Sequence, residues 1–445
     1  MSIYYNRREF VKKAATTAAG VGLLGSYSFA SARQIGANEK IRVAVVGTWS
    51  RGAQLARAFV GTTGMEVAYI CDVDDEAIAR GIDAVKNGGQ QANVTGVKDF
   101  RKALDDQTVD AVVIAMPDHW HAPATIMALQ AGKHVYVEKP GSHNAREGEL
   151  VVKAQKKYGR VVQMGSQRRS WTYVREAMQD LKSGIIGDPH YARTWYGANR
   201  GPIGYGRVVA VPANLDYDFW QGPVPRRPFR DNLIHYNWHW FWHWGTGELL
   251  NNGTHFIDLA RIGLGVTHPI KVSSLGGRYA YRDDWETPDL QITTFDFPEN
   301  KTIMWEGKSC NTRPIEGVGA ALSFHSEQGT MVINNNEYIV YDNRNNEIKR
   351  FADGDEGGTV DLRGPALGRD VIHITDFGDA IRNSRKPVAD FEDVNISVTM
   401  LHVGNIAHRV GRTLRVNPMN GRVMDDPEAG QLWGREYEPG WELTV

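Results

Sequence analysis

From residue 41 onward, the chain alternates apolar runs with amphipathic segments. Continuous apolar, β-branched runs are typical of strands buried on both faces. They occupy residues 41–46, 65–71, 109–117, 133–140 and 160–165. Segments with helical spacing lie at residues 50–60, 100–107, 121–132 and 146–159. This alternation predicts an α/β domain with a Rossmann-type doubly wound parallel sheet over residues 38–165.

After residue 165 the pattern becomes one of alternating polar and apolar positions. Such runs fall at residues 190–197, 270–281, 290–297, 301–307, 321–327, 329–334 and 337–342. They predict a C-terminal α+β domain, residues 166–445, with a largely antiparallel open sheet that is covered on one face. Helical spacing returns in the second half of residues 234–265 and at 370–383 and 392–414, whereas residues 351–370 have the composition of a surface loop.

Charge and cysteine content exclude several classes of protein. With 51 Lys and Arg against 52 Asp and Glu, the chain has no basic field for nucleic acid. Cys71 and Cys310 are the two cysteines, which excludes a disulfide framework. A metal site would need histidines and carboxylates, and we predict none.

Residues 1–32 have the pattern of an export signal. Arg7 and Arg8 precede Glu9-Phe10-Val11-Lys12, as in a twin-arginine signal, and an apolar, Gly- and Ala-rich stretch leads to Ala30-Ser31-Ala32 as a cleavage site. An ordinary basic helix or a membrane anchor is the alternative, but the stretch is short and Gly-rich for a span of roughly 20 residues. We therefore expect a periplasmic protein with no stable membrane span after processing.

Residues 45–54 (VVGTWSRGAQ) match a dinucleotide-binding turn except at one position. Gly47 and Gly52 stand at the first and third glycines of G-x-G-x-x-G, and Trp49 replaces the second. A strand precedes the turn, a helix follows it, and Asp72 ends the next strand. Amides of the turn, including Ser50 and Arg51, would then meet a pyrophosphate, while Asp72 would accept ribose hydroxyls and favour NAD over NADP. A structural turn that binds nothing is the alternative.

Two further motifs, AVVIAMPDHWHAP and AGKHVYVEKP, closely resemble consecutive motifs of the glucose–fructose oxidoreductase and inositol dehydrogenase (Gfo/Idh/MocA) family. The resemblance places Pro117 and His121 beside the nicotinamide and its ribose. It places Glu138, Lys139 and Pro140 at a catalytic turn with a cis proline. It also implies that helices at 369–412 pack back on the first domain, and that the open sheet serves in homo-oligomers.

The resemblance also names the acid/base groups. Lys139 would hydrogen-bond the substrate hydroxyl and help to move its proton, because hydride transfer from carbon requires the hydroxyl proton to leave as well. Relatives carry a second acid/base residue that corresponds to His255, often with an aspartate four residues earlier. Here that position holds Asn251, which cannot take a proton, so His255 would act without a carboxylate. A buried structural histidine is the alternative.

Aromatic residues between His235 and Trp244 suggest a wall that contacts sugar rings, with His239 and Trp240 among its members. The nearby histidines also have helical spacing that zinc could use, but a core or a stacking wall explains the segment better. Arg168, Arg169 and Trp171 follow the last strand of the first domain and are further candidates for the substrate pocket.

We therefore expect an enzyme that uses NAD to oxidise or reduce a secondary hydroxyl or ketone of a sugar, glycoside or cyclitol. A glycoside hydrolase of the same fold, which oxidises the sugar transiently, is the first alternative, and a noncatalytic sugar-binding protein is the second. Since a periplasm holds no free NAD pool, an exported enzyme must keep its cofactor. We expect the bulky ring of Trp49 to cover the pyrophosphate region and so to slow cofactor release.

Overall fold

The computed structural model describes residues 39–352 and 367–445. The expected export signal at residues 1–32 and most of the expected loop at 351–370 lie outside the described residues.

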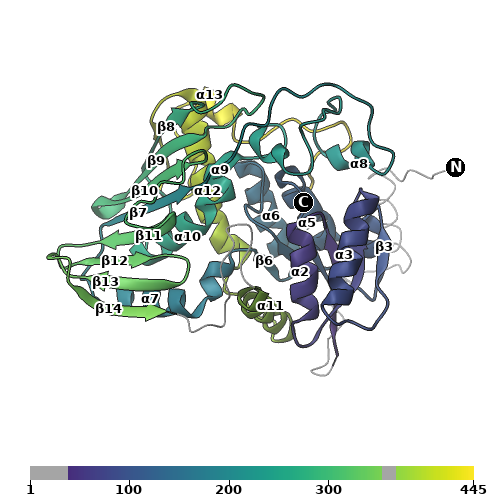
Figure 1. Ribbon diagram of the computed structural model, residues 1–445, viewed down its shortest axis with the longest axis horizontal. Helices are drawn as coiled ribbons and strands as arrows, with labels where there is room; N and C mark the ends of the chain where they lie inside the picture. The colour runs from purple at the N-terminus through teal and green to yellow at the C-terminus, as the bar shows by residue number, and fades with distance from the viewer. Residues whose placement is uncertain (1–38, 353–366) are drawn as a thin grey trace, which may run out of the picture.

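The first domain is built on a parallel sheet of six strands in the order β3-β2-β1-β4-β5-β6 (Figure 1). The strands are β1 Ile41–Val46, β2 Met65–Cys71, β3 Thr95–Val97, β4 Ala111–Ile114, β5 His134–Val137 and β6 Val162–Met164. Helices α2 Arg51–Val60 and α3 Asp75–Asn87 pack on one face, and α4 Arg101–Asp105, α5 Asp118–Gln130 and α6 Ala145–Tyr158 pack on the other. The expected doubly wound parallel sheet is confirmed.

The second domain holds a sheet of nine strands in the order β14-β13-β12-β11-β7-β10-β9-β8-β15. The strands are β7 Tyr191–Gly197, β8 Lys271–Gly277, β9 Leu290–Phe297, β10 Lys301–Lys308, β11 Ala320–His325, β12 Thr330–Ile333, β13 Glu337–Tyr341, β14 Glu347–Ala352 and β15 Leu414–Arg415. Neighbouring strands are antiparallel except for β7 and β10, which are parallel. The expected, largely antiparallel sheet is therefore confirmed.

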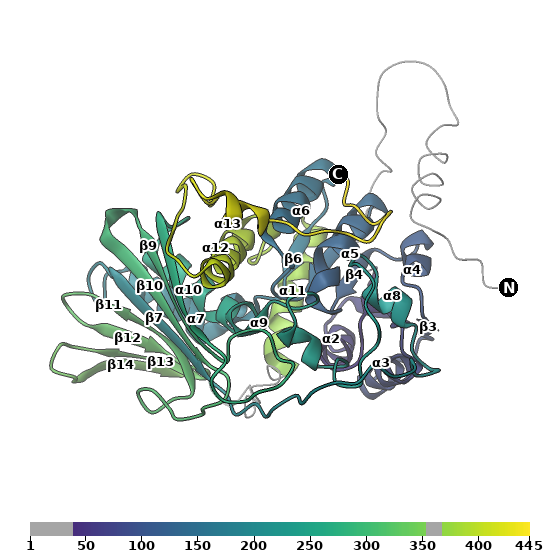
Figure 2. The ribbon, with the colours of Figure 1, turned by 90° about the horizontal axis from the view of Figure 1, so that it is seen from above.

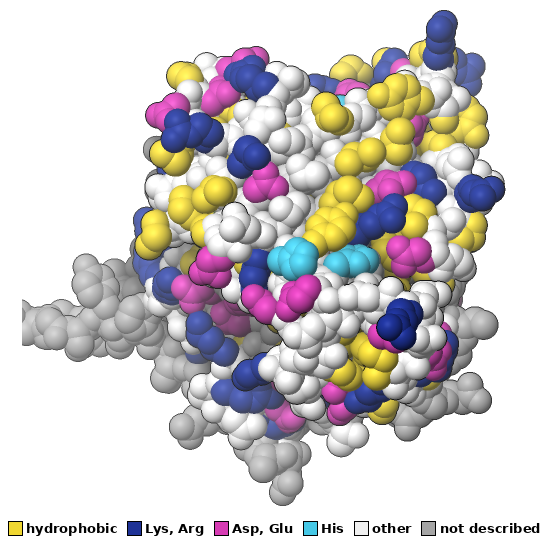
Figure 3. Space-filling model, turned by 90° about the vertical axis from the view of Figure 1, so that its left-hand side faces the viewer, with side chains coloured by type: hydrophobic (Ala, Val, Ile, Leu, Met, Phe, Trp, Pro, Cys, Tyr) yellow, Lys and Arg dark blue, Asp and Glu magenta, His cyan; other side chains and the backbone are white. Residues whose placement is uncertain are grey.

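One face of the second sheet is covered, as expected, and the other faces outward. Helices α7 Thr172–Lys182, α10 Gly253–Leu264 and α12 Phe391–Val410 contribute buried side chains to one core with the strands. Figure 2 shows these helices between the sheet and the first domain. On the outward face, hydrophobic side chains gather in a band among charged ones (Figure 3).

Residues near the C-terminus complete the core of the first domain. Helix α11, Leu367–Arg382, places Ile374, Phe377 and Ile381 in the same core cluster as strands β1 and β2. Residues 441–445 reach the opposite face, where the ring of Trp441 meets that of Trp120 edge-on at 5.3 Å. Both faces of the first sheet therefore depend on chain that follows the second sheet.

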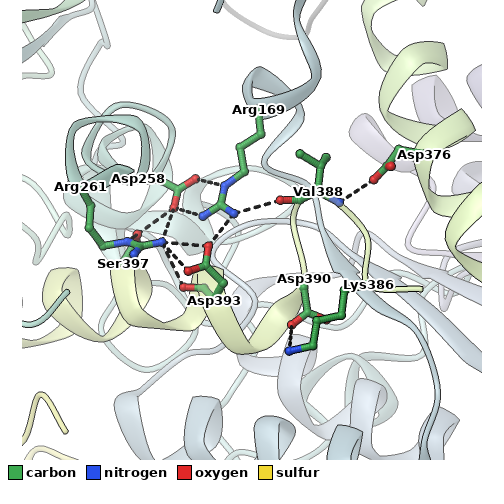
Figure 4. Close-up of polar contacts among 9 residues, drawn as sticks. All are labelled: Arg169, Asp258, Arg261, Asp376, Lys386, Val388, Asp390, Asp393 and Ser397. Atoms are coloured by element: carbon green, nitrogen blue, oxygen red, sulfur yellow. Dashed lines mark hydrogen bonds and ion pairs between the residues drawn. The ribbon is translucent and has the colours of Figure 1, made fainter. Parts of the chain in front are cut away.

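Figure 4 shows an ion-pair network, buried except at Asp393, that joins α10, α12 and the short helix η1, Gln167–Ser170. The Arg169 guanidinium donates to both oxygens of Asp258 at 2.6 and 2.7 Å and to Asp393 at 2.7 Å. Arg261 donates to Asp393 and to the Ser397 hydroxyl, which donates in turn to Asp258. Arg169 and Asp258 thus hold helices together and do not line the substrate pocket, contrary to the sequence-based expectation for Arg169.

A long connection, residues 198–246, leaves the second sheet and runs over the first domain before it returns. Its short helix α8, Tyr217–Gln221, lies beside the first domain in Figures 1 and 2. Backbone hydrogen bonds fix it there, from Asp216 to the carbonyl of Val73 and from Asp75 to the carbonyl of Asn214. The remaining short elements are η2 Asn237–Trp240, α9 Gly247–Asn251, η3 Pro298–Asn300 and α13 Pro427–Gln431.

Candidate active site

A cavity of about 1160 Å³ lies where the carboxyl ends of the first-sheet strands meet α9, α10 and the connection 198–246. The expected site residues that line it are Gly47, Trp49, Ser50, Arg51, Asp72, Pro117, His121, Glu138, Lys139, Arg168, Trp171, His239, Trp240, Asn251 and His255. Gly52 and Pro140 do not line the cavity but directly follow two residues that do, Arg51 and Lys139, and the Lys139–Pro140 peptide is cis, as the family resemblance implies.

The turn between β1 and α2 is closely packed against the end of β4. Gly47 has φ +84°, and a Cβ there would lie 2.7 Å from backbone atoms of Ala115 and Met116. A Cβ on Gly52 would lie 1.8 Å from the carbonyl oxygen of Gly47. Both glycines are therefore required by geometry. Ser50 makes no side-chain cap at the start of α2, so the amides of the first helical turn remain available to an anion.

Asp72 is held at the end of β2 with its carboxylate at the cavity. One oxygen accepts from the backbone N–H of Thr48 at 2.6 Å, and the other accepts from that of Asp74 at 3.2 Å. Burial raises the pKa of Asp72 to about 6, although these backbone hydrogen bonds oppose the shift. Asp72 thus couples the dinucleotide-type turn to the strand beside it.

Trp49 contacts the connection from the second domain. Its ring stacks on that of His235, with centroids 3.6 Å apart and planes 9° apart, and the Arg80 guanidinium lies 4.1 Å from the Trp49 ring centroid. His235 is fixed in turn by Asp74, whose carboxylate lies 2.9 Å from Nε2. Trp49 and His235 therefore form a bridge between the two domains at the edge of the cavity.

Lys139 lines the cavity and is hydrogen-bonded to Asn251. Its Nζ donates to the backbone carbonyl and to the Oδ1 of Asn251, both at 2.7 Å. The Asn251 amide donates to Glu248 at 3.3 Å, which fixes the orientation of its side chain. Burial lowers the pKa of Lys139, and the negative charges of Glu138, Asp118 and Glu248 oppose that shift. The site therefore holds a desolvated lysine beside a neutral amide.

Two histidines share the cavity with Lys139. Burial lowers the pKa of His121 to about 4, and its Nε2 lies 2.7 Å from the carbonyl oxygen of Met116. Burial and the positive charges of Arg168 and Lys139 lower the pKa of His255. The Nδ1 of His255 is buried and has no hydrogen-bond partner within the described residues, and both histidines are neutral near pH 7. A neutral imidazole can accept a proton.

Several site residues were not expected from the sequence. Asp118 lines the cavity, and burial raises its pKa to about 7. Asp118 directly follows Pro117 in the motif AVVIAMPDHWHAP, so the sequence motif could have identified Asp118 as a site residue. Arg200 and Trp285 come from segments without a recognisable motif, and both line the cavity.

Aromatic residues of the second domain line the same cavity as Lys139. Trp240 stacks on Trp285 with centroids 4.0 Å apart, and Arg200 lies 4.8 Å from the Trp240 ring centroid. His239 stacks on Trp238 at 3.6 Å. Flat aromatic faces of this kind suit the apolar faces of sugar rings.

Within residues 39–352 and 367–445, no group of three or more His, Cys, Asp or Glu side chains could hold a metal ion. Instead His235 pairs with Asp74, and His243 lies 2.8 Å from the carbonyl oxygen of Pro225. In the same part of the chain, no helix has both the length and the apolar character needed to cross a membrane.

Comparison with known proteins agrees with this geometry. Residues 41–166 match the family model described as "Oxidoreductase family, NAD-binding Rossmann fold". Residues 190–310 and 366–443 match the model described as "Oxidoreductase family, C-terminal alpha/beta domain".

Curated relatives match over part of the chain. A "Glycosyl hydrolase family 109 protein" from Saccharopolyspora erythraea is 27% identical over 212 residues, which are 44% of this chain and 45% of the relative. The match thus spans less than half of that relative's length.

Solved structures match over most of the chain. Levoglucosan dehydrogenase, solved with NADH and levoglucosan, has a TM-score of 0.65 and 19% identity, with 85% of this chain and 99% of the other covered. An aldose-aldose oxidoreductase from Caulobacter crescentus, solved with glycerol, has a TM-score of 0.63 and 18% identity, with 85% and 100% covered. These likenesses establish the shared fold. The two family models together, on the two domains described above, show that the chain belongs to the Gfo/Idh/MocA oxidoreductase family and that its first domain is an NAD-binding Rossmann domain.

Proposed function

We propose that this protein is an NAD-dependent oxidoreductase that acts on a secondary hydroxyl or ketone of a sugar, glycoside or cyclitol. The observation that carries the proposal is Lys139, a partly buried amine that lines a large cavity together with an NAD-type turn and an aromatic wall. A sugar-binding protein without catalysis would have no use for a desolvated lysine at that position, because burying an amine costs free energy.

The residues of the first domain fit NAD. The α2 amides and the closely packed Gly47 turn suit a pyrophosphate, and Asp72 offers a carboxylate for the ribose hydroxyls. The Nδ1 of His121 is buried and has no partner within the described residues. When bound, NAD accepts a hydride from the carbon that is oxidised and returns it in the reverse direction.

Lys139 handles the hydroxyl proton in this proposal. A neutral lysine has two N–H donors and one lone pair. The two acceptors of Asn251 take both donors and leave the lone pair for the substrate hydroxyl. Because Asn251 carries no charge, it stabilises the ammonium less than the aspartate common in relatives would. Asn251 therefore favours the form of Lys139 that can act as a base, and His255 is the second proton acceptor in the cavity.

Glycoside hydrolysis through transient oxidation is the second candidate. The name of the curated relative favours it, and the same lysine and cofactor would serve both reactions. The two outcomes differ in net redox change. Purified protein is denatured to identify released nucleotide, and native protein is then screened with glycosides for NADH fluorescence and for free aglycone. Accumulating NADH or transfer to an added keto-sugar supports the dehydrogenase, aglycone without net NADH supports the hydrolase, and neither supports the binding protein.

Cofactor affinity should fall as the pH decreases through about 6. Burial raises the pKa of Asp72 to about 6, so the carboxylate that accepts the ribose hydroxyls exists above this pH and is protonated below it. NAD affinity, measured by calorimetry on protein stripped of nucleotide, should weaken between pH 7 and pH 5. An affinity that is constant over this range would contradict the prediction.

The matched variants for Asp72 separate its charge from its shape. Asp72→Asn should remove most of the pH dependence, because it cannot be titrated. Asp72→Ala should weaken NAD binding and relax discrimination against NADP, since the carboxylate is the group that repels a 2′-phosphate. An unchanged preference for NAD would mean that Asp72 does not contact the ribose.

We also propose that the protein is exported to the periplasm with NAD already bound and that Trp49 slows NAD release. The stacking of Trp49 on His235 and its contact with Arg80 support this role, because they tie the dinucleotide turn to the connection 198–246. Trp49→Gly should raise nucleotide loss during dialysis by up to roughly thirtyfold, since stacking and cation–π contacts each contribute about 1 kcal/mol. Trp242, which lies outside the cavity, provides the control variant Trp242→Gly. Equal retention of nucleotide in wild type and Trp49→Gly would refute this role of Trp49. A mature protein found only in the cytoplasm would refute export.

We further propose that the outward face of the second sheet binds a second copy of the chain. Leu275 and Ile292 are cross-strand partners on this face and are 75% and 40% exposed. Light scattering should give a mass above 49.6 kDa, the mass of one chain, and Leu275→Glu should lower it.

A further inference from the structure

Three arginines line the cavity, and they differ in how their charge is neutralised. Arg51 donates to Glu138 at 2.8 Å and to both oxygens of Asp370 at 2.7 and 2.8 Å. Arg200 donates to Glu248 at 2.7 Å. Within the described residues, Arg168 has no carboxylate partner, and its Nη2 donates to the neutral Oδ1 of Asn335 at 2.9 Å.

The surroundings of Arg168 occupy the faces of its guanidinium and leave its edge available. Trp171 and Phe256 each lie against it, with ring centroids 4.8 and 4.4 Å from the guanidinium carbon. One terminal nitrogen, Nη2, is used by Asn335. The Nε and Nη1 atoms make no hydrogen bond within the described residues. A planar cation that packs against two aromatic rings and keeps free N–H donors is shaped to receive a planar anion.

An arginine in this position is costly without an anion. Burial and the neighbouring charge of Arg369 lower the pKa of Arg168 to about 10, whereas for Arg200 the effect of burial is outweighed by Glu248 together with other nearby groups, and the pKa is raised. Arg168 is partly buried, and a cation that loses part of its hydration without gaining a counter-ion receives no matching Coulomb stabilisation. A negatively charged ligand in the cavity would supply that gain.

The position of Arg168 assigns this ligand to the substrate side of the cavity. Arg168 lies on η1, which follows β6 at the far edge of the first sheet from the Gly47 turn. Its ring neighbour Phe256 is adjacent to His255 on α10, and the charge of Arg168 lowers the pKa of His255. The cation therefore lies beside the proposed proton acceptor and away from the amides that suit a pyrophosphate.

We propose that Arg168 binds a carboxylate of the substrate, so that the protein acts on a uronic acid or a similar sugar acid. This inference rests on the proposed function and narrows its substrate class. A carboxylate matches one guanidinium in charge and in planar geometry. A phosphate monoester carries up to two negative charges, so one guanidinium would not neutralise it. The other two arginines of the cavity are already paired with carboxylates.

The test compares sugars that differ at one substituent. Protein with bound NAD is given methyl glycosides of glucose, galactose and mannose, together with the corresponding methyl glycosiduronates and 6-sulfates. Substrate consumption is followed by chromatography and NADH by fluorescence, so that either redox outcome is detected. A charged hydrogen bond contributes about 1.5–3 kcal/mol, so kcat/KM should be roughly 10–100-fold higher for a glycosiduronate than for its neutral partner.

Variants assign this preference to Arg168. Arg168→Gln should bring the ratio of kcat/KM between the charged and neutral sugars close to one, mostly through KM, and Arg168→Lys should restore part of it. Asn335→Ala is the matched control, because it removes the hydrogen-bond partner of Arg168 but keeps the cation. Asn335→Ala should retain the preference for the glycosiduronate.

The outcomes separate this proposal from the proposed function. Turnover of neutral sugars that equals or exceeds that of their glycosiduronates would overturn the carboxylate site and leave the oxidoreductase standing. A preference for the sulfates would overturn the choice of carboxylate. If no sugar is consumed, the proposed function fails, and calorimetric titration with glucuronate decides the site. Binding that Arg168→Gln abolishes would support it, and absence of binding would refute it.

Discussion

Replacing Lys139 with alanine is expected to reduce turnover roughly 10²–10⁴-fold while NAD binding is nearly unchanged. Lys139 is a partly buried amine at the cavity wall that donates to two oxygens of Asn251, and in the proposed mechanism its neutral form accepts the hydroxyl proton. Without it the hydroxyl proton has no positioned acceptor when the hydride leaves. The measurement is turnover at saturating sugar, together with the nucleotide released per molecule on denaturation. Turnover within a few-fold of wild type would remove Lys139 from the mechanism.

Asn251→Asp provides a control that keeps the lysine. A carboxylate beside Nζ stabilises the ammonium and raises the pKa of Lys139. Oxidation requires the neutral amine, so its rate increases as the pH rises through this pKa. In Asn251→Asp the increase should therefore move to higher pH, whereas a merely structural role of Asn251 would lower the rate equally at every pH.

Replacing Arg169 with leucine is expected to destabilise the protein by about 3–5 kcal/mol, the usual consequence of removing one partner from a buried ion pair. Asp258 is 1% exposed and would lose two hydrogen bonds from Arg169. The network in Figure 4 joins helices that also carry His255, so the loss should reach the cavity. The midpoint of urea unfolding measures the effect.

Two comparisons test the cause of this destabilisation. Arg207 donates to Asp231 on the surface, where its side chain is 84% exposed, so Arg207→Leu should change stability by less than about 1 kcal/mol. Arg169→Leu combined with Asp258→Leu should be less destabilising than Arg169→Leu alone, because no unpaired charge remains. A double variant that is as unstable as the sum of both single variants would show that packing, rather than charge, is responsible.

The strands of the first domain were predictable because a strand that is buried on both faces consists of a continuous run of apolar residues. Residues 41–46 and 65–71 were expected as strands and form β1 and β2 with these bounds. Strand β3, Thr95–Val97, was missed because it is short and contains Gly96 at an exposed edge. Strand β14, Glu347–Ala352, was missed because an outer strand of an open sheet keeps polar residues on both sides.

The candidate site was predictable where it depends on local motifs and not where it depends on long-range pairing. Gly47, Asp72 and Lys139 follow strands, so topology alone places them at one edge of the sheet. The contact of Trp49 with His235 joins residues far apart in the chain, and no periodicity marks it.

Arg168 and Arg169 illustrate the same limit at adjacent positions. They are neighbours in the sequence and look alike there, yet one lines the cavity and the other binds Asp258 within the protein. Only the fold distinguishes them, because the partner of Arg169 comes from a helix that begins more than eighty positions later.

The packing of late residues on the first sheet has a consequence for the order of folding. Ile374 and Phe377 cover one face of that sheet, and Trp441 covers part of the other. A growing chain that has only just passed β6 therefore exposes apolar surface on both faces of its first sheet. Domains usually fold in turn as they emerge from the ribosome. Here the nucleotide domain cannot be completed until almost the whole chain has been synthesised, so the two domains acquire their final stability in one late, cooperative step.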